Sequence, residues 1–266
     1  MTFQQKLDLI VKKQNSLLCV GLDADIEKLP VKFRNGKNPQ FEFNKYIIGQ
    51  THGLVCCFKL NSAFYESHGP DGIQELKNTC DYIRQAHPDI PIILDFKRGD
   101  VENTNDSYVQ FAFDYLHVDA VTVHPYMGKE SLEPFLKEKN KGIFVLCRTS
   151  NPGASEFQDM MVEGKPLYLL VAERVTKVWN KFNNCYLVVG ATNPDELAKV
   201  RDIVGDTTLL VPGIGSQGGS VEMTVKAGMN SQKGGIIVHS ARGIIFAKNP
   251  REEAQKLKDE INSFRA

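Results

Sequence analysis

The stretch PIILDFKRGDVENTNDSYVQFAFDYLHVDAVTV, residues 91–123, contains the alternation that decides the fold. It begins with an apolar run at 91–96, continues into an amphipathic stretch at 105–116, and returns to a second apolar run at 120–123. The apolar runs are continuous rather than strictly alternating, which is typical of parallel strands buried on both faces. Residues 91–123 therefore predict a strand, a helix and a second strand parallel to the first.

The same unit recurs along the whole chain. Apolar runs predict eight strands, at residues 17–22, 54–60, 91–96, 120–123, 142–147, 186–189, 208–211 and 235–239. Amphipathic stretches between them predict helices, the clearest at 71–85, 105–116, 167–182, 194–203 and 252–264. Eight such units predict an α/β protein with a single (β/α)8 TIM-barrel domain over residues 1–266, since this fold typically takes ~250 residues. An open doubly wound sheet is the main alternative, but no Gly-x-Gly-x-x-Gly follows the first strand.

Composition narrows the class of protein. Lys plus Arg and Asp plus Glu each total 32, and this balance argues against nucleic acid as a partner. No apolar run approaches the ~20 residues of a membrane span, and residues 1–13 lack the apolar centre of a signal peptide. The six cysteines lack the spacing of a zinc site, which favours reduced core thiols. We therefore expect a cytoplasmic protein that binds neither nucleic acid nor membrane.

Polar residues collect at the carboxyl ends of the predicted strands, where barrels of this type form their active sites. They are Asp23, Asp25, Lys59, Asn61, Asp95, Lys97, Asp100, His124 and the run Arg148-Thr149-Ser150-Asn151. Asp95 and Lys97 are two residues apart, so an extended strand would point both side chains to the same side. Acidic neighbours favour the ammonium form of Lys97, which suits a proton donor rather than a base.

A structural salt-bridge network that closes the barrel mouth would use the same Asp and Lys side chains. For a single pair, that interpretation is the simpler one. Several charged residues that converge on one rim favour a functional site, because burying charges without a function is costly.

Glycine-rich turns follow the seventh and eighth predicted strands. They read PGIGSQGG at 212–219 and HSARG at 239–243. Loops at these positions of a barrel frequently hold a phosphate on backbone N–H groups, and an arginine can add a fork of donors. We expect a phosphate site here that includes Gly215, Gln217 and Arg242. His124 and His239 match no metal-site spacing, so we interpret them as hydrogen-bonded structural residues.

The segment Asp95-x-Lys97-x-x-Asp100, followed by Thr104, resembles the signature of the orotidine 5′-phosphate decarboxylases. The resemblance extends to GLD at 21–23, FKLN at 58–61, PGIG at 212–215 and Arg242, and RTSNP at 148–152 resembles the longer-chain branch of that family. It implies decarboxylation of orotidine 5′-monophosphate to UMP and CO2, the last step of de novo pyrimidine nucleotide synthesis. It also implies no metal, no organic cofactor, and a homodimer with shared active sites.

The resemblance assigns roles to individual residues. Lys97 would protonate carbon 6 of the pyrimidine as CO2 leaves, with Asp95 against the substrate carboxylate. Asp100 would complete the charged array across the dimer interface, together with Thr104. The binding residues implied are Asp23, Lys59 and Asn61 at the ribose, Thr149 or Ser150 at the pyrimidine, Pro212 near the base, and Gln217 and Arg242, with the Gly215 turn, at the phosphate.

Two alternatives remain open on the sequence. A metal-dependent sugar-phosphate decarboxylase or aldolase on the same barrel would use Asp23 and Asp95 to hold Mg²⁺. A non-catalytic nucleotide-binding protein could retain the fold, although binding alone does not require the clustered charges around Lys97.

Overall fold

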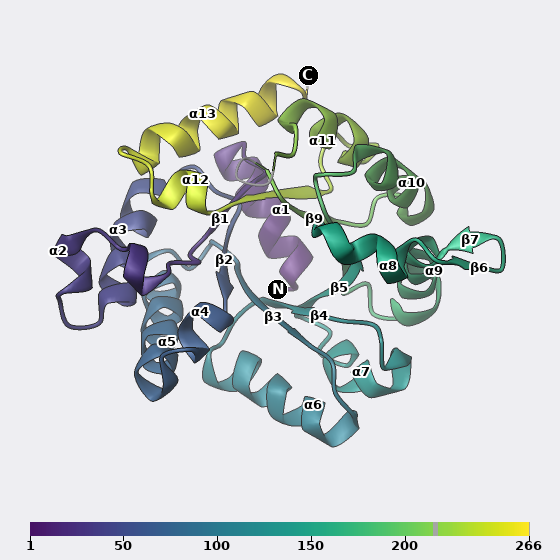
Figure 1. Cartoon of the computed structure of the whole chain (residues 1–266), viewed down its shortest axis with the longest axis horizontal. Helices are drawn as coiled ribbons and strands as arrows, with labels where there is room; N and C mark the ends of the chain where they lie inside the picture. The colour runs from purple at the N-terminus through teal and green to yellow at the C-terminus, as the bar shows by residue number, and fades with distance from the viewer. Residues whose placement is uncertain (215–217, 266) are drawn as a thin grey trace.

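The strands of the protein close into a parallel barrel (Figure 1). The computed structural model describes residues 1–214 and 218–265. Within these residues eight strands pair in the order β1-β10-β9-β8-β5-β4-β3-β2. Their bounds are β1 Leu18–Gly21, β2 Cys57–Asn61, β3 Ile92–Arg98, β4 Ala120–Val123, β5 Gly142–Arg148, β8 Cys185–Val189, β9 Leu209–Pro212 and β10 Ile236–Ser240. Each overlaps a predicted strand, which confirms the (β/α)8 barrel.

Helices surround the barrel as an outer layer (Figure 1). The longer ones are α3 Pro39–Thr51, α5 Gly69–Ala86, α6 Glu102–Val109, α7 Gly128–Leu136, α9 Leu167–Arg174, α10 Pro194–Val204, α11 Val221–Gly228 and α13 Pro250–Ser263. Short helices follow several strands: η1 Ile26–Lys28, α2 Val31–Arg34, α4 Ala63–Glu66 and α12 Arg242–Ile245. The predicted helices 105–116 and 167–182 are present, but each changes to π-helical turns, at Gln110–Tyr115 (η2) and Val175–Trp179 (η4).

The first helix, α1 (Phe3–Gln14), closes the amino end of the barrel. A capping box formed by Thr2 and Gln5 starts the helix. Phe3 then packs edge-on against Phe144 and Tyr186, with ring centroids 5.5 and 5.4 Å away. Because α1 covers the amino end, a ligand site inside the barrel would have to open at the opposite, carboxyl end.

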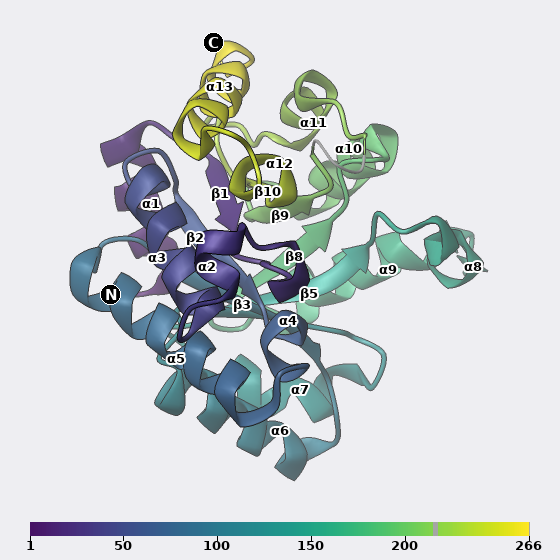
Figure 2. The ribbon, with the colours of Figure 1, turned by 60° about the vertical axis from the view of Figure 1, so that its left-hand side comes forward.

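The long connection after β5 is an ordered excursion rather than an irregular loop. Residues 152–166, called here the α8 excursion, contain η3 Pro152–Ala154, α8 Ser155–Gln158, and a hairpin of β6 Met161–Val162 and β7 Lys165–Pro166. The excursion projects outward from the barrel in both ribbon views (Figure 2). An ion pair of 3.0 Å between Arg148 Nε and Asp159 Oδ1 anchors its base.

The cysteines and the helices bear on two predictions from the composition, that of reduced core thiols and that of no membrane span. All six cysteines are buried and unpaired. In the part of the chain that the structure describes, no helix combines the length and the apolarity that crossing a membrane requires.

Candidate active site

A cavity of about 690 Å³ lies at the carboxyl ends of the barrel strands. It brings together most of the predicted site residues: Asp23, Lys59, Asn61, Asp95, Lys97, Thr149, Ser150, Pro212 and Arg242. Thr122, Gln158 and His239 also line it, and the sequence had not assigned them to the site. Gly215 and Gln217 lie outside the described residues, so their place in the site stays a prediction.

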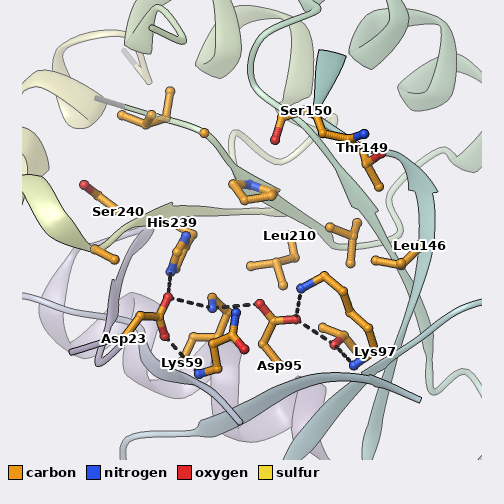
Figure 3. A pocket seen from close by; sticks show the side chains of 18 of the residues that line it. Asp23, Lys59, Asp95, Lys97, Leu146, Thr149, Ser150, Leu210, His239 and Ser240 are labelled. Carbon is orange, nitrogen blue, oxygen red and sulfur yellow. Dashed lines mark hydrogen bonds and ion pairs between the residues drawn. The ribbon is translucent and has the colours of Figure 1, made fainter. Parts of the chain in front are cut away.

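The floor of the cavity is a row of alternating charges (Figure 3). The Lys59 ammonium lies 3.3 Å from Asp23 Oδ2 and 2.9 Å from Asp95 Oδ2, and its side chain is 2% exposed. The strand register places these groups, because Gly21 pairs with Lys59 in β1–β2 and Asn61 pairs with Asp95 in β2–β3.

The charges in this row support one another. Burial would lower the pKa of Lys59, but the charges of Asp23 and Asp95 outweigh it, and the net shift is upward. Burial would raise the pKa of Asp95, but Lys59 and then Lys97 outweigh it, and the net shift is well downward. Burial also raises the pKa of Asp23, with Lys59 opposing and Asp95 adding to the rise. Lys59 and Asp95 therefore stay ionised as a buried pair.

Lys97 ends the row and faces the cavity. Its Nζ lies 2.6 Å from Asp95 Oδ1, and 46% of its side chain is exposed, against 2% for Lys59. Lys97 is thus the ammonium that a ligand in the cavity can reach.

The contact between Lys97 and Asp95 was predicted, but the regular strand geometry behind that prediction was wrong. Lys97 has a left-handed backbone, with φ of 47°, and the β3–β4 register shifts between Leu94 and Arg98. Thr122 holds this bulge: its Oγ1 accepts from Lys97 N at 3.1 Å and donates to Asp95 Oδ1 at 2.8 Å. Bulges of this kind re-aim side chains at functional sites.

The α8 excursion contributes to the wall of the cavity through Gln158. Gln158 Oε1 accepts from Thr149 N at 2.8 Å, and its Nε2 donates to Thr149 Oγ1 at 2.9 Å. Ser150 packs against Gly190, where a Cβ would lie 2.7 Å from Ser150 Cβ. From the sequence, residues 148–166 are a long connection after the fifth predicted strand, of a length that is often functional, but no residue type in it points to Gln158.

Asp100 and Thr104 are not among the residues that line the cavity of their own chain. Asp100 is exposed; its Oδ1 accepts from Val101 N at 2.7 Å, and its backbone N–H donates to Asn105 Oδ1 at 3.0 Å. Their expected roles across a dimer interface stay predictions.

His239 does not fit the structural role that we expected for it. Its side chain is 10% exposed, lines the cavity, and places Nε2 3.9 Å from Asp23 Oδ2. This Nε2 is buried without a hydrogen-bond partner among the described residues. Burial, with the charges of Lys59 and Lys97, lowers the pKa of His239 well below its usual value, so the imidazole is neutral.

The residues around the charged row are an ammonium-centred set rather than a set of metal ligands. The Lys59 ammonium occupies the space between Asp23 and Asp95. Within residues 1–214 and 218–265, no group of three or more His, Cys, Asp or Glu side chains is arranged to hold a metal ion.

Comparison with known proteins identifies the family. The model of the orotidine 5′-phosphate decarboxylase / HUMPS family matches residues 16–257. Orotidine 5′-phosphate decarboxylase of Cupriavidus necator is 45% identical to this chain over 272 residues. The match covers 100% of this chain and 99% of the Cupriavidus protein. The structure of Leishmania donovani OMP decarboxylase superposes with a TM-score of 0.90 at 39% identity, covering 100% of this chain and 99% of that one.

A longer protein shares the same barrel. Leishmania donovani UMP synthase superposes with a TM-score of 0.92 at 40% identity over 100% of this chain, which spans 57% of the synthase. With the family model matched from residue 16 to residue 257 and the cavity built from the motif residues, the chain belongs to the orotidine 5′-phosphate decarboxylase / HUMPS family.

Proposed function

We propose that this chain is a carboxy-lyase that converts orotidine 5′-monophosphate to UMP and CO2, the last step of de novo pyrimidine nucleotide synthesis. One observation carries the proposal: the row Asp23–Lys59–Asp95–Lys97 lines the cavity, and Lys97 is its accessible ammonium. The decarboxylases of this family that the chain resembles over its full length support the choice of substrate.

In the proposed reaction, Lys97 supplies the proton. The bond between carbon 6 and the carboxylate breaks, CO2 leaves, and the electron pair stays on carbon 6. Nζ of Lys97 then donates a proton to this carbon, and water reprotonates the lysine afterwards. Because the carbanion has no ring orbital into which it can delocalise, a fixed ammonium beside it stabilises charge where it develops. Enzymes lower barriers by roughly 8–23 kcal/mol, and this reaction needs the upper part of that range.

Asp95 has two tasks in the proposal. It holds Lys97 in position through the 2.6 Å contact, and it lies against the substrate carboxylate. With three donors on its oxygens, from Lys59, Lys97 and Thr122, it stays ionised when the substrate binds. Its negative charge therefore disfavours the substrate carboxylate and favours the departure of neutral CO2.

The other cavity residues bind the rest of the nucleotide in this proposal. Asp23, Lys59 and Asn61 hold the ribose hydroxyls, and Thr149 or Ser150 contacts the pyrimidine near Pro212. Arg242 binds the phosphate with Gln217 and the turn at Gly215. Binding energy from the phosphate would then be used to exclude water and assemble the charged site.

We also propose that the chain works as a cytoplasmic homodimer in which Asp100 and Thr104 of each subunit complete the cavity of the other. Their position outside their own cavity supports this arrangement. Mixing inactive Lys97→Ala and Asp100→Ala subunits tests it. Random exchange of subunits in an equal mixture makes about half of the dimers mixed, and each mixed dimer has one intact site out of two. About a quarter of the wild-type activity should therefore return. Mixtures that stay inactive after subunit exchange would exclude shared sites.

The first experiment follows the absorbance change of orotidine 5′-monophosphate with purified protein in buffer that contains EDTA. We expect rapid conversion to UMP, because the proposed chemistry uses Lys97 and no metal. Lys97→Ala should lose turnover but still bind UMP, and Lys97→Arg, which keeps the charge but is a poor proton donor, should not restore it. Turnover of a sugar phosphate that depends on Mg²⁺, with none of orotidine 5′-monophosphate, would assign the chain to metal-dependent relatives.

A further inference from the structure

His239 and Asp23 face each other across a narrow gap on the floor of the cavity. Nε2 of His239 lies 3.9 Å from Asp23 Oδ2, which is too far for a direct hydrogen bond. A single oxygen atom between them can lie within hydrogen-bond distance of both. Figure 3 shows the imidazole of His239 directed at the Asp23 carboxylate on the floor of the cavity.

The fold keeps this gap clear. β10 pairs with β1, with Cys19 opposite His239, so closing the barrel brings the ring beside the strand that leads to Asp23. Gly21 lies at the point of closest approach. A Cβ at this position would lie 2.5 Å from His239 Nε2 and 3.1 Å from Asp23 Oδ2. The absence of a side chain at Gly21 therefore gives His239 its place at the carboxylate.

The hydrogen bonds of the two groups define what fits between them. Oδ1 of Asp23 accepts from Asn61 N at 2.9 Å, and Oδ2 accepts from Lys59 Nζ at 3.3 Å. Oδ2 has one further lone pair. Nε2 of His239 is buried with no partner among the described residues, which carries an energetic penalty until a ligand or water supplies one.

A neutral imidazole and a carboxylate select a hydroxyl group. Burial, together with the charges of Lys59 and Lys97, keeps the pKa of His239 low, so its Nε2 can donate one hydrogen bond without adding a positive charge. A hydroxyl oxygen accepts this N–H and donates its own hydrogen to Asp23. A ligand atom that lacks hydrogen, or a methylene group, leaves at least one of the two groups unpaired.

We infer that His239 is a substrate-binding residue that, with Asp23, holds one hydroxyl of the ribose and so selects ribonucleotides over deoxyribonucleotides. The inference rests on the proposed function, because it takes a nucleotide as the ligand of this cavity. It replaces the structural role that the sequence suggested for His239.

Calorimetric titration of the full chain with UMP, 2′-deoxy-UMP and 3′-deoxy-UMP tests the inference. Wild type should bind UMP at least about 10-fold more tightly than one of the deoxy compounds, since that ligand leaves buried polar groups unpaired. His239→Leu should reduce this ratio about 3- to 10-fold, the loss of one hydrogen bond, and should leave the affinity for the discriminated deoxy compound nearly unchanged.

His239→Gln is the matched variant. Its side chain is similar in volume to that of Leu, but its amide can place an N–H close to the position of Nε2. It should keep more of the preference for UMP than His239→Leu keeps. A purely structural histidine would instead weaken all three ligands by the same factor in both variants. Equal ratios in wild type and His239→Leu would overturn the inference while leaving the proposed function intact. Failure of wild type to bind UMP at all would overturn both.

Discussion

Lys59→Met should destabilise the protein strongly, because it removes the cation from between two buried carboxylates. The Lys59 ammonium lies 2.9 and 3.3 Å from Asp95 and Asp23, and its side chain is 2% exposed. Removing one partner of such a buried group typically costs about 3–5 kcal/mol. In a chain of this size each kcal/mol lowers Tm by ~2–4 °C, so the expected fall is roughly 6–20 °C.

The effect should depend on pH in a defined direction. Lys59 and Lys97 hold the pKa of Asp95 below its usual value, so Asp95 stabilises the fold near neutral pH and loses that contribution as pH falls through its folded pKa. Without Lys59, the pKa values of Asp23 and Asp95 both rise and the carboxylates take up protons at a higher pH. The stability difference between variant and wild type should therefore shrink from pH 7 toward pH 4.

Urea unfolding followed by circular dichroism at both pH values measures this difference. Lys13→Met is the control, since Lys13 forms an ion pair of similar length, 2.8 Å to Asp89, with side chains 66% and 65% exposed. Exposed pairs contribute at most about 1 kcal/mol. If Lys59→Met unfolds within about 0.5 kcal/mol of Lys13→Met at pH 7, the charged row does not stabilise the barrel mouth as argued.

Substitutions at three further positions test other parts of the site by steady-state kinetics with orotidine 5′-monophosphate. Arg242→Ala should raise KM about 10- to 100-fold with a smaller change in kcat, the effect of a lost charge-assisted contact to phosphate, and an unchanged KM rules that contact out. Thr122→Val should lower kcat about 10-fold, because its hydroxyl links Lys97 to Asp95, and Thr122→Ser should recover most of it. Gln158→Ala should raise KM and speed proteolysis within the α8 excursion; unchanged cleavage would show that this side chain does not tether the excursion.

The barrel was predictable because continuous apolar runs in the sequence indicate which segments are buried. The sequence indicates less clearly which residues of neighbouring strands pair with each other. The predicted strand 54–60 starts earlier than β2, which begins at Cys57, although Leu54, Val55 and Cys56 are fully or nearly fully buried. Hydrophobic runs report burial, whereas the ends of a strand depend on its neighbours. The short elements of the α8 excursion were missed because contacts with β5 anchor them, such as Arg148 with Asp159.

The candidate site was predictable where local spacing determines it. Asp95 and Lys97 are in contact, as their separation in the sequence suggested. The contact depends, however, on a left-handed backbone conformation at Lys97, which lysine seldom adopts. The hydroxyl of Thr122, 25 positions further along the chain, holds that conformation. No sequence pattern confined to one strand could have indicated this contact between two strands.

His239 shows the same limit over a much larger separation in the sequence. The role of this histidine at a strand end cannot be inferred until Asp23, which follows the first barrel strand, lies beside it, and this happens only when β10 pairs with β1 to close the barrel. The site therefore depends on closure as well as on its own residues. His239, Lys59 and Asp95 lie on β10, β2 and β3, and Asp23 follows β1, so the site needs four successive strands, β10-β1-β2-β3, in register. Two carboxylates around one ammonium, beside an imidazole whose Nε2 has no hydrogen-bond partner in the part of the chain that the structure describes, would not collect on their own, because burying them is unfavourable. The apolar strands below must supply the stability that holds them together, and a site strained in this way is where a nucleotide gains most by supplying the missing partners.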